Sequence, residues 1–253
     1  MNVDNPNGNY IFQPGGSPYS SGVRAMPGYE LRHITLMRPL PLAKGLDAIA
    51  RHLEGMQRPP QTLCGLELRC PAAYSFAGFA AFNEQYRNLL QHHGMLSDGP
   101  NAVARTNIAP AVEPPTEQMI HAFTYTVPGV RLSGRPSFVI SGAGELVQAA
   151  LNSSAIVRPG EMSEDAMAEK ALLVMDVMES RLSALGVDWP QVTVVNVYTI
   201  HNIAPLLHDI LLKRMREAAR LGVHWNLSRP PVIGIEFEMD MRGVADERYE
   251  EMR

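Results

Sequence analysis

The sequence lacks the cysteine content typical of secreted, disulfide-stabilised proteins. Its 253 residues include only two cysteines, Cys64 and Cys70, within the stretch CGLELRC. If this stretch is a strand, the two lie roughly 20 Å apart, at about 3.3 Å per residue, which is too far for a disulfide. Two cysteines without a disulfide framework fit a reducing compartment, so we expect a cytoplasmic protein.

An excess of positive charge and long apolar runs are also missing. The formal net charge is −4 and no basic block stands out, so we expect no nucleic-acid partner. No apolar run reaches the roughly 20 residues that a membrane helix requires, so we expect no membrane segment. No Cys/His cluster has metal-ligand spacing, and the GAG at 142–144 is not a dinucleotide fingerprint. We therefore expect neither a metal nor a cofactor.

What is present is a periodic pattern of helices and strands in each half of the chain. Residues 1–28 begin with an Asn-, Gly-, Pro- and Ser-rich stretch, which predicts a flexible arm. The clearest helix is predicted over 163–186, with Ser163 as N-cap, Gly186 after its end and an apolar stripe rich in methionine. The other segments with helix or strand patterns are 42–56, 59–69, 75–94, 101–110, 118–127, 135–146, 188–200, 203–222 and 227–241.

The order of these elements is similar in the two halves. Three landmarks recur in the same order at nearly the same spacing: Pro60-Gln61 and Pro190-Gln191, Gly94 and Gly222, Arg105 and Arg229. This favours an internal duplication, with a first, degenerate unit over 29–130 and a second unit over 131–253. The alternative is a chance agreement between two halves of α+β composition.

Arg105 is the most informative single residue, because it interrupts the apolar strand pattern NAVARTNIAP. A charged side chain seldom enters such a segment without a partner. A guanidinium offers parallel donors that match a carboxylate, which suggests a small organic acid as ligand. The alternative partner is an internal carboxylate such as Glu113 or Glu236.

Several of these pieces together resemble the RidA family, also called the YjgF or reactive-intermediate deaminase family. The similar segments are FVISGAGEL, the long helix after it, VTVVNVYTIHNIAPL and the two strands that contain arginine. The resemblance covers residues 137–236 well and 40–127 more loosely. It implies an α+β fold of two repeated chorismate-mutase-like (RidA-like) units, each a mixed sheet covered by two helices. Single-unit members form trimers, so the resemblance also implies a homo-oligomer, namely a trimer.

The resemblance also implies an activity and site residues. Members hydrolyse enamines and imines to ketones and ammonia, and a strand arginine binds the substrate carboxylate. By this resemblance Arg105 and Arg229 are the substrate-binding arginines and Asn202 lies at a substrate-binding position. Ser141 lies at the serine of the family's turn and is a candidate catalytic residue. A substrate with two carboxylates, such as 2-aminomuconate, would suit two arginines.

The acid of the site is harder to assign from the sequence. The family places a glutamate on its last strand, but 119–125 contains no acid and Glu247 lies too far along. Glu145, which follows a glycine-rich turn beside Ser141, is the candidate catalytic acid, with a solvated turn residue as the alternative. Glu236 and Glu238 share one strand face, for which an exposed polar face is favoured over a pair of catalytic acids.

Three functions remain open at this point. The first is a deaminase of a small carboxylate-bearing enamine or imine. The second is a chorismate-processing hydrolase, because chorismatases resemble a fusion of two RidA-like halves. The third is a family member that binds a small acid without turnover.

Overall fold

The fold is a mixed α+β arrangement around one large sheet. The computed structural model describes residues 1–16, 18–97, 99–129, 134–147 and 152–252. The strands are β1 (Val3–Asn5), β2 (Tyr10–Gln13), β3 (Gly22–Ala25), β4 (Tyr29–Pro41), β5 (Leu63–Arg69), β6 (Ala104–Pro110), β7 (Met119–Pro128), β8 (Phe138–Gly144), β9 (Val194–Thr199), β10 (His224–Arg229), β11 (Glu238–Gly243) and β12 (Asp246–Glu250). The α-helices are α1 (Leu42–Gly55), α2 (Phe76–His92), α3 (Glu164–Leu185), α4 (Ala204–Leu206) and α5 (Lys213–Met215), with a π-helical stretch Leu207–Leu212 and a 3-10 stretch Arg216–Leu221 completing the last helical segment.

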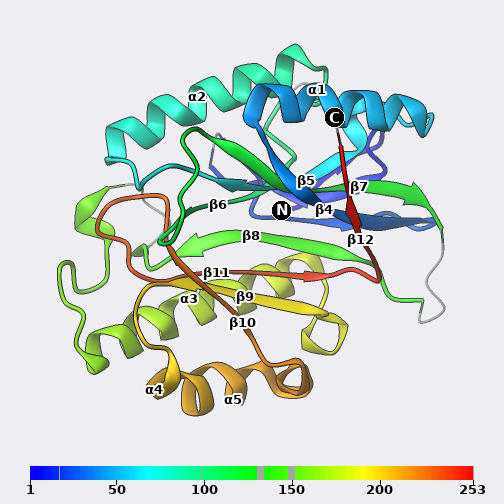
Figure 1. Cartoon of the computed structure of the whole chain (residues 1–253). Coiled ribbons are helices and arrows are strands. Elements are labelled where there is room, and N and C mark those ends of the chain that lie inside the picture. Colours follow the sequence, from blue (N-terminus) through cyan, green and yellow to red (C-terminus); the bar gives the residue numbers. More distant parts are fainter. Residues whose placement is uncertain (17, 98, 130–133, 148–151, 253) are drawn as a thin grey trace.

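Helices cover two opposite sides of the molecule, and the strands lie between them (Figure 1). Among the described residues the strands are hydrogen-bonded in the order β1-β2-β3-β8-β11-β9-β10-β6-β5-β7-β4-β12. The helices α1 and α2 lie on one side, next to β4–β7, whereas α3, α4 and α5 lie on the other side, below β8, β9 and β11. The sheet therefore folds back on itself, and parts of its inner surface are covered by other strands rather than by helices.

The two halves of the chain are joined where β6 meets β10. β5 runs parallel to β6, and β9 runs parallel to β10. β6 and β10 pair antiparallel over a short stretch, with Ser228 opposite Pro110 and Arg229 opposite Ala109. This pairing brings the arginine strand of the first half against the second half.

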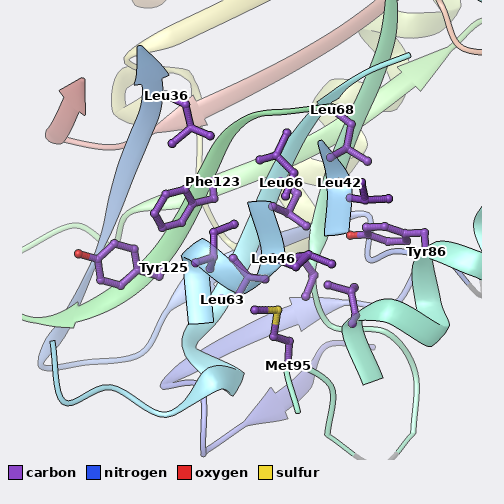
Figure 2. Close-up of a cluster of buried hydrophobic side chains, with 14 of the residues drawn as sticks. Leu36, Leu42, Leu46, Leu63, Leu66, Leu68, Tyr86, Met95, Phe123 and Tyr125 are labelled. Carbon is purple, nitrogen blue, oxygen red and sulfur yellow. The ribbon is translucent and has the colours of Figure 1, made fainter. Parts of the chain in front are cut away.

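The described residues form two large apolar cores, each centred on one half. The first is formed by α1, α2, β4, β5 and β7, with Ile156, Val232 and Ile235 of the second half packed into it, and Figure 2 shows its leucines and aromatic rings converging from the helices and strands. The second is formed by β8, β9, β11 and the face of α3 that carries buried methionines at 167, 175 and 178. These methionines fill the core, as the sequence pattern predicts.

The helix predicted over 163–186 is confirmed with its caps. Ser163 Oγ accepts a hydrogen bond from Ala166 N at 3.3 Å, and Gly186 ends the helix with a left-handed φ of 67°. Cys64 and Cys70 are both free and buried, as their spacing predicts.

The N-terminal segment differs from the flexible arm that the sequence predicts for residues 1–28. β2 pairs with β3, and β3 pairs with β8, so the segment is part of the large sheet. Tyr10 is fully buried, and its hydroxyl donates to Leu63 O at 3.1 Å. The abundant Asn, Gly and Pro suggested a loose chain, but Tyr10, Phe12 and Val23 bury enough apolar surface to hold the segment in place.

Candidate active site

The candidate site is a cavity of about 430 Å³ at the junction of the two halves. Its polar wall contains Arg105 and Asn107 from β6, Arg181 from α3 and Glu238 from β11. The apolar wall includes Phe79, Leu146, Val177, Pro231, Val232 and Ile235. Part of the N-terminal segment, including Tyr19, closes one side. The volume lies within the range of about 300–1,000 Å³ that is usual for small-molecule sites.

Arg105, the strand arginine of the sequence analysis, lies in this cavity wall and is only 3% exposed. Its guanidinium carbon lies 4.5 Å from the ring centre of Tyr19 and 4.8 Å from that of Tyr86. Nη2 donates to Asn83 Oδ1 at 2.8 Å, whereas buried Nη1 has no hydrogen-bond partner in the described part of the chain. Burial lowers the pKa of this guanidinium, but arginine remains charged at neutral pH. One arm of a buried cation is thus left for an incoming acceptor.

Arg181 brings a second guanidinium to the cavity, and sequence reasoning missed it. Nη1 donates to Ser141 O at 2.7 Å and to Gly142 O at 3.4 Å. Burial lowers the pKa of Arg181 as well. A signal for it exists in the helix pattern, because Arg181 interrupts the apolar spacing between Met178 and Leu185.

Glu238 is the acid of the cavity and is 5% exposed. Burial, followed by the negative charge of Asp240, raises the pKa of Glu238 to about 8, against the opposing effect of Arg105 and Arg181. Below that pH the carboxyl is protonated and can donate a proton. The sequence analysis favoured an exposed polar face for Glu236 and Glu238, and this is wrong for Glu238 because another part of the sheet covers its face.

Asp240, two residues beyond Glu238, is held by three hydrogen bonds from other side chains. The Asp240 carboxylate accepts from Thr106 Oγ1 at 2.5 Å, Asn196 Nδ2 at 2.8 Å and Tyr198 OH at 2.9 Å. Burial and then nearby Glu67 raise the pKa of Asp240 to about 6, so at neutral pH Asp240 is mainly ionised and Glu238 mainly protonated. Two carboxyl groups with such different pKa values are typical of acid–base sites.

Glu145, the predicted catalytic acid, does not line the cavity. It is fully buried, and Oε1 accepts from Glu236 N at 2.7 Å and from Lys170 Nζ at 3.1 Å. Oε2 accepts from Phe237 N at 3.0 Å. Because both oxygens hold the chain that leads into β11, Glu145 positions the strand of Glu238 and does not face a substrate.

Ser141 is placed beside the site but behind its wall. Its Oγ accepts from Arg105 N at 3.0 Å and donates to Ser20 O. The hydroxyl therefore links β8 to β6 and to the N-terminal segment. It is fully buried and has no free access to a ligand, so the structure gives it a positioning role instead of the predicted catalytic one.

Arg229 and Asn202, predicted to bind the substrate, lie outside the cavity. The Arg229 side chain is 49% exposed, and its Nη1 lies 3.4 Å from Glu236 Oε2. This is the internal carboxylate that the sequence analysis gave as the alternative partner. Asn202 is exposed, and its Oδ1 accepts from Ala204 N at 3.0 Å at the start of α4. The second guanidinium of the site comes from a helix and not from the repeated strand.

The described residues contain no group of three or more His, Cys, Asp or Glu side chains arranged to hold a metal ion. None of their helices combines the length and apolar character needed to cross a membrane.

Comparison with known proteins identifies the family. The model of the family described as 2-aminomuconate deaminase CnbZ matches residues 2–248. The chain belongs to this family. A curated relative, the 2-amino-5-chloromuconate deaminase of Comamonas testosteroni, is 39% identical over 241 residues, covering 95% of each protein. Among solved structures, a chorismatase aligns with a TM-score of 0.49 at 12% identity, over 93% of this chain and 81% of that one.

The family of 2-aminomuconate deaminases agrees with the deaminase class that the resemblance implied. The family model that matches the chain is described as 2-aminomuconate deaminase. Membership in the RidA/YjgF family with two repeated units stays a prediction.

One prediction concerns Gly142, whose missing side chain makes room for the acid of this deaminase. A Cβ at this position would overlap Glu238 Oε1. Since the atom in the way ends a movable side chain, Gly142→Ala should fold but displace the carboxyl, lowering kcat/KM for deamination by about 10²-fold. Gly55→Ala is the matched control, because a Cβ there meets nothing within 4 Å. Wild-type kinetics in Gly142→Ala would contradict this placement of Glu238.

Proposed function

We propose that the cavity between Arg105, Arg181 and Glu238 is the site at which this enzyme deaminates 2-aminomuconate or a close relative of it. The chain is an enzyme of a deaminase family, and its 39% identical relative is named for a chlorinated 2-aminomuconate. The observation that carries the proposal is one cavity lined by the buried Arg105, the half-buried Arg181 and the buried Glu238, whose pKa is raised to about 8.

The charges of the cavity fit the charges of such a substrate. 2-Aminomuconate has a carboxylate at each end of a flat six-carbon chain, with the amino group next to one of them. Two carboxylates neutralise two guanidiniums, and the ion pairs are strengthened because burial lowers the local dielectric constant. The apolar wall, which includes Phe79, Leu146 and Ile235, suits the flat carbon chain between the two ends.

Glu238 is the group proposed to move protons. In the first step its carboxylic acid protonates the carbon β to nitrogen, using the C=C electron pair, while the nitrogen lone pair forms C=N⁺. The Glu238 carboxylate then removes a proton from water as the oxygen adds to the C=N carbon. The resulting carbinolamine takes a proton from Glu238 on nitrogen and loses ammonia, and its hydroxyl proton returns to Glu238 as C=O forms. One water enters, one ammonia leaves, and Glu238 is again protonated.

The site also supports the finer prediction of two RidA-like units in one chain. Its walls come from both predicted units, with Arg105 in 29–130 and with Arg181 and Glu238 in 131–253. Each unit contributes most of one apolar core, although Ile156, Val232 and Ile235 of the second unit pack into the core of the first. In single-unit RidA proteins the cleft lies between neighbouring subunits, so a fused pair would supply both sides of one cleft. Assembly into trimers is a further proposal that rests on this resemblance. Location in the cytoplasm is a proposal that rests on the two cysteines without a disulfide framework.

The direct test is the reaction itself. The purified protein should release ammonia from 2-aminomuconate in amounts equal to the substrate consumed, measured by a coupled ammonia assay and by loss of substrate absorbance. Chorismate should give no pyruvate. Pyruvate from chorismate, without ammonia from 2-aminomuconate, would overturn the proposal in favour of the hydrolase alternative. Binding of 2-aminomuconate without turnover would favour the non-catalytic alternative.

A further inference from the structure

Asn107 is a buried residue of the cavity wall that the mechanism above does not use. It follows Arg105 by two positions on β6, so both side chains project from the same face of the strand. Asn107 is 3% exposed, and its Nδ2 has no hydrogen-bond partner in the described part of the chain. Buried donors are seldom left without an acceptor, so this atom and Arg105 Nη1 form a pair of open donors.

The orientation of the Asn107 amide is set by a chain of two further residues. Gln118 Nε2 donates to Asn107 Oδ1 at 3.0 Å, and Tyr74 OH donates to Gln118 Oε1 at 2.9 Å. The Asn107 carbonyl is thus occupied, and the NH₂ group is the part left for a ligand. Tyr74 is held in place in turn, because its ring stacks on Phe82 with centres 5.4 Å apart.

The charge of the surroundings selects the kind of ligand. An amide NH₂ beside a buried guanidinium disfavours a cation and favours an acceptor with negative charge. A carboxylate has two oxygens and can accept from both donors at once.

We propose that Asn107 Nδ2 and Arg105 Nη1 together bind one carboxylate of the substrate, and that Gln118 and Tyr74 keep the amide turned toward it. Arg181 then binds the other carboxylate. Asn107 is a substrate-binding residue on this proposal, whereas Gln118 acts only through Asn107 and is a positioning residue. The inference rests on the proposed function, since it assumes that the cavity takes a dicarboxylate.

The test uses binding of cis,cis-muconate, which has both carboxylates but no amino group to lose. Its Kd is measured by titration calorimetry for the full-length wild-type chain and for variants. Asn107→Leu, which keeps the branching and the number of side-chain heavy atoms and removes the donor, should raise Kd by about 10- to 10²-fold, as expected for a lost hydrogen bond to a charged group.

The sharper variant is Gln118→Glu. An ionised glutamate at position 118 can only accept hydrogen bonds. It still accepts one from the Tyr74 hydroxyl, but its other oxygen must accept from Asn107 Nδ2. The Asn107 amide then turns, and its carbonyl oxygen faces the carboxylate. We expect a loss of affinity at least as large as in Asn107→Leu, whereas Gln118→Leu, which leaves the amide free to turn either way, should give a smaller loss.

Gln85→Glu is the control for the added charge. Gln85 and Gln118 both line a second hollow, next to the start of α1 and to α2, but Gln85 is exposed on α2 and forms no hydrogen bond with Asn107 among the described residues. It should bind muconate as the wild type does. Thermal melting confirms that each variant is folded.

The outcomes separate this inference from the proposed function. If the wild type fails to bind muconate, the dicarboxylate site itself is wrong. If the wild type binds and Arg105→Lys weakens binding, but Asn107→Leu and Gln118→Glu bind normally, the inference about Asn107 is overturned while the proposed function stands. An equal loss in Gln85→Glu would assign the effect to charge and also overturn it.

Discussion

Glu238→Gln should lower kcat for deamination by about 10²- to 10⁴-fold, which is the usual contribution of a positioned acid–base group. Glutamine keeps the shape of the side chain and can still donate a hydrogen bond, but it cannot transfer a proton. KM should change little, because the two arginines that bind the carboxylates remain. Steady-state kinetics with 2-aminomuconate would measure both constants.

The pH dependence gives this prediction a second readout. Since Glu238 must be protonated for the first step and its pKa is raised to about 8, kcat/KM of the wild type should fall as the pH rises through about 8. The residual activity of Glu238→Gln should lack this decrease. Besides burial, four charged groups set the value, namely Asp240 on β11, Arg105 on β6, Glu145 just after β8 and Arg181 on α3.

The same raised pKa has a defined effect on stability. Between the ordinary value of 4.5 and the folded value of about 8, the folded chain holds a proton that the unfolded chain has lost. Stability from Glu238 is therefore fully present below about pH 4.5 and is lost as the pH rises through about 8. Glu238→Gln should accordingly melt at a higher temperature than the wild type at pH 9 and at a similar temperature near pH 5.

The control for this series is Glu236→Gln, two residues earlier. Glu236 is hydrogen-bonded to His201 at 2.9 Å and lies outside the cavity wall. It should retain wild-type kcat and the same alkaline decrease. A Glu238→Gln variant with wild-type kcat would remove this carboxyl from the mechanism.

Arg105→Lys should lower kcat/KM by about 10²- to 10³-fold, in line with the cost of breaking a buried, hydrogen-bonded charge pair. Lysine keeps the positive charge, but its ammonium group is a single donor centre on a shorter side chain. The planar guanidinium of Arg105 can donate to Asn83 Oδ1 with one NH₂ group and to a carboxylate with the other. An ammonium group lacks this arrangement. The variant also loses the cation–π contacts that the Arg105 guanidinium makes with the rings of Tyr19 and Tyr86.

Arg229→Lys is the matched control, since Arg229 is the other strand arginine of the two halves. It is half-exposed and paired with Glu236, so its kinetics should stay within about twofold of the wild type. The opposite result, with Arg229→Lys impaired and Arg105→Lys normal, would move the substrate-binding site to the second strand.

Local patterns in the sequence predicted much of the structure where a signal lies within one element. The caps and apolar stripe of 163–186 define α3, because both depend on residues within a few turns of each other. Arg105 was found as a ligand-binding candidate because a charge in an apolar strand is anomalous on its own. Tyr10 and the N-terminal strands were missed, since their stability comes from contacts with residues far along the chain.

The sequence by itself determined the α+β class, the main helices and strands, and the presence of one buried arginine that requires an acidic partner. Only the tertiary structure placed Arg181 and Glu238 in one cavity with Arg105 and left Glu145 and Arg229 outside its wall. The physical reason is that the strand alternation of β11 marks a polar face without saying what covers it. Packing of one half against the other turned that face from a solvated surface into a buried wall, and this burial, together with the charges around it, raised the pKa of Glu238.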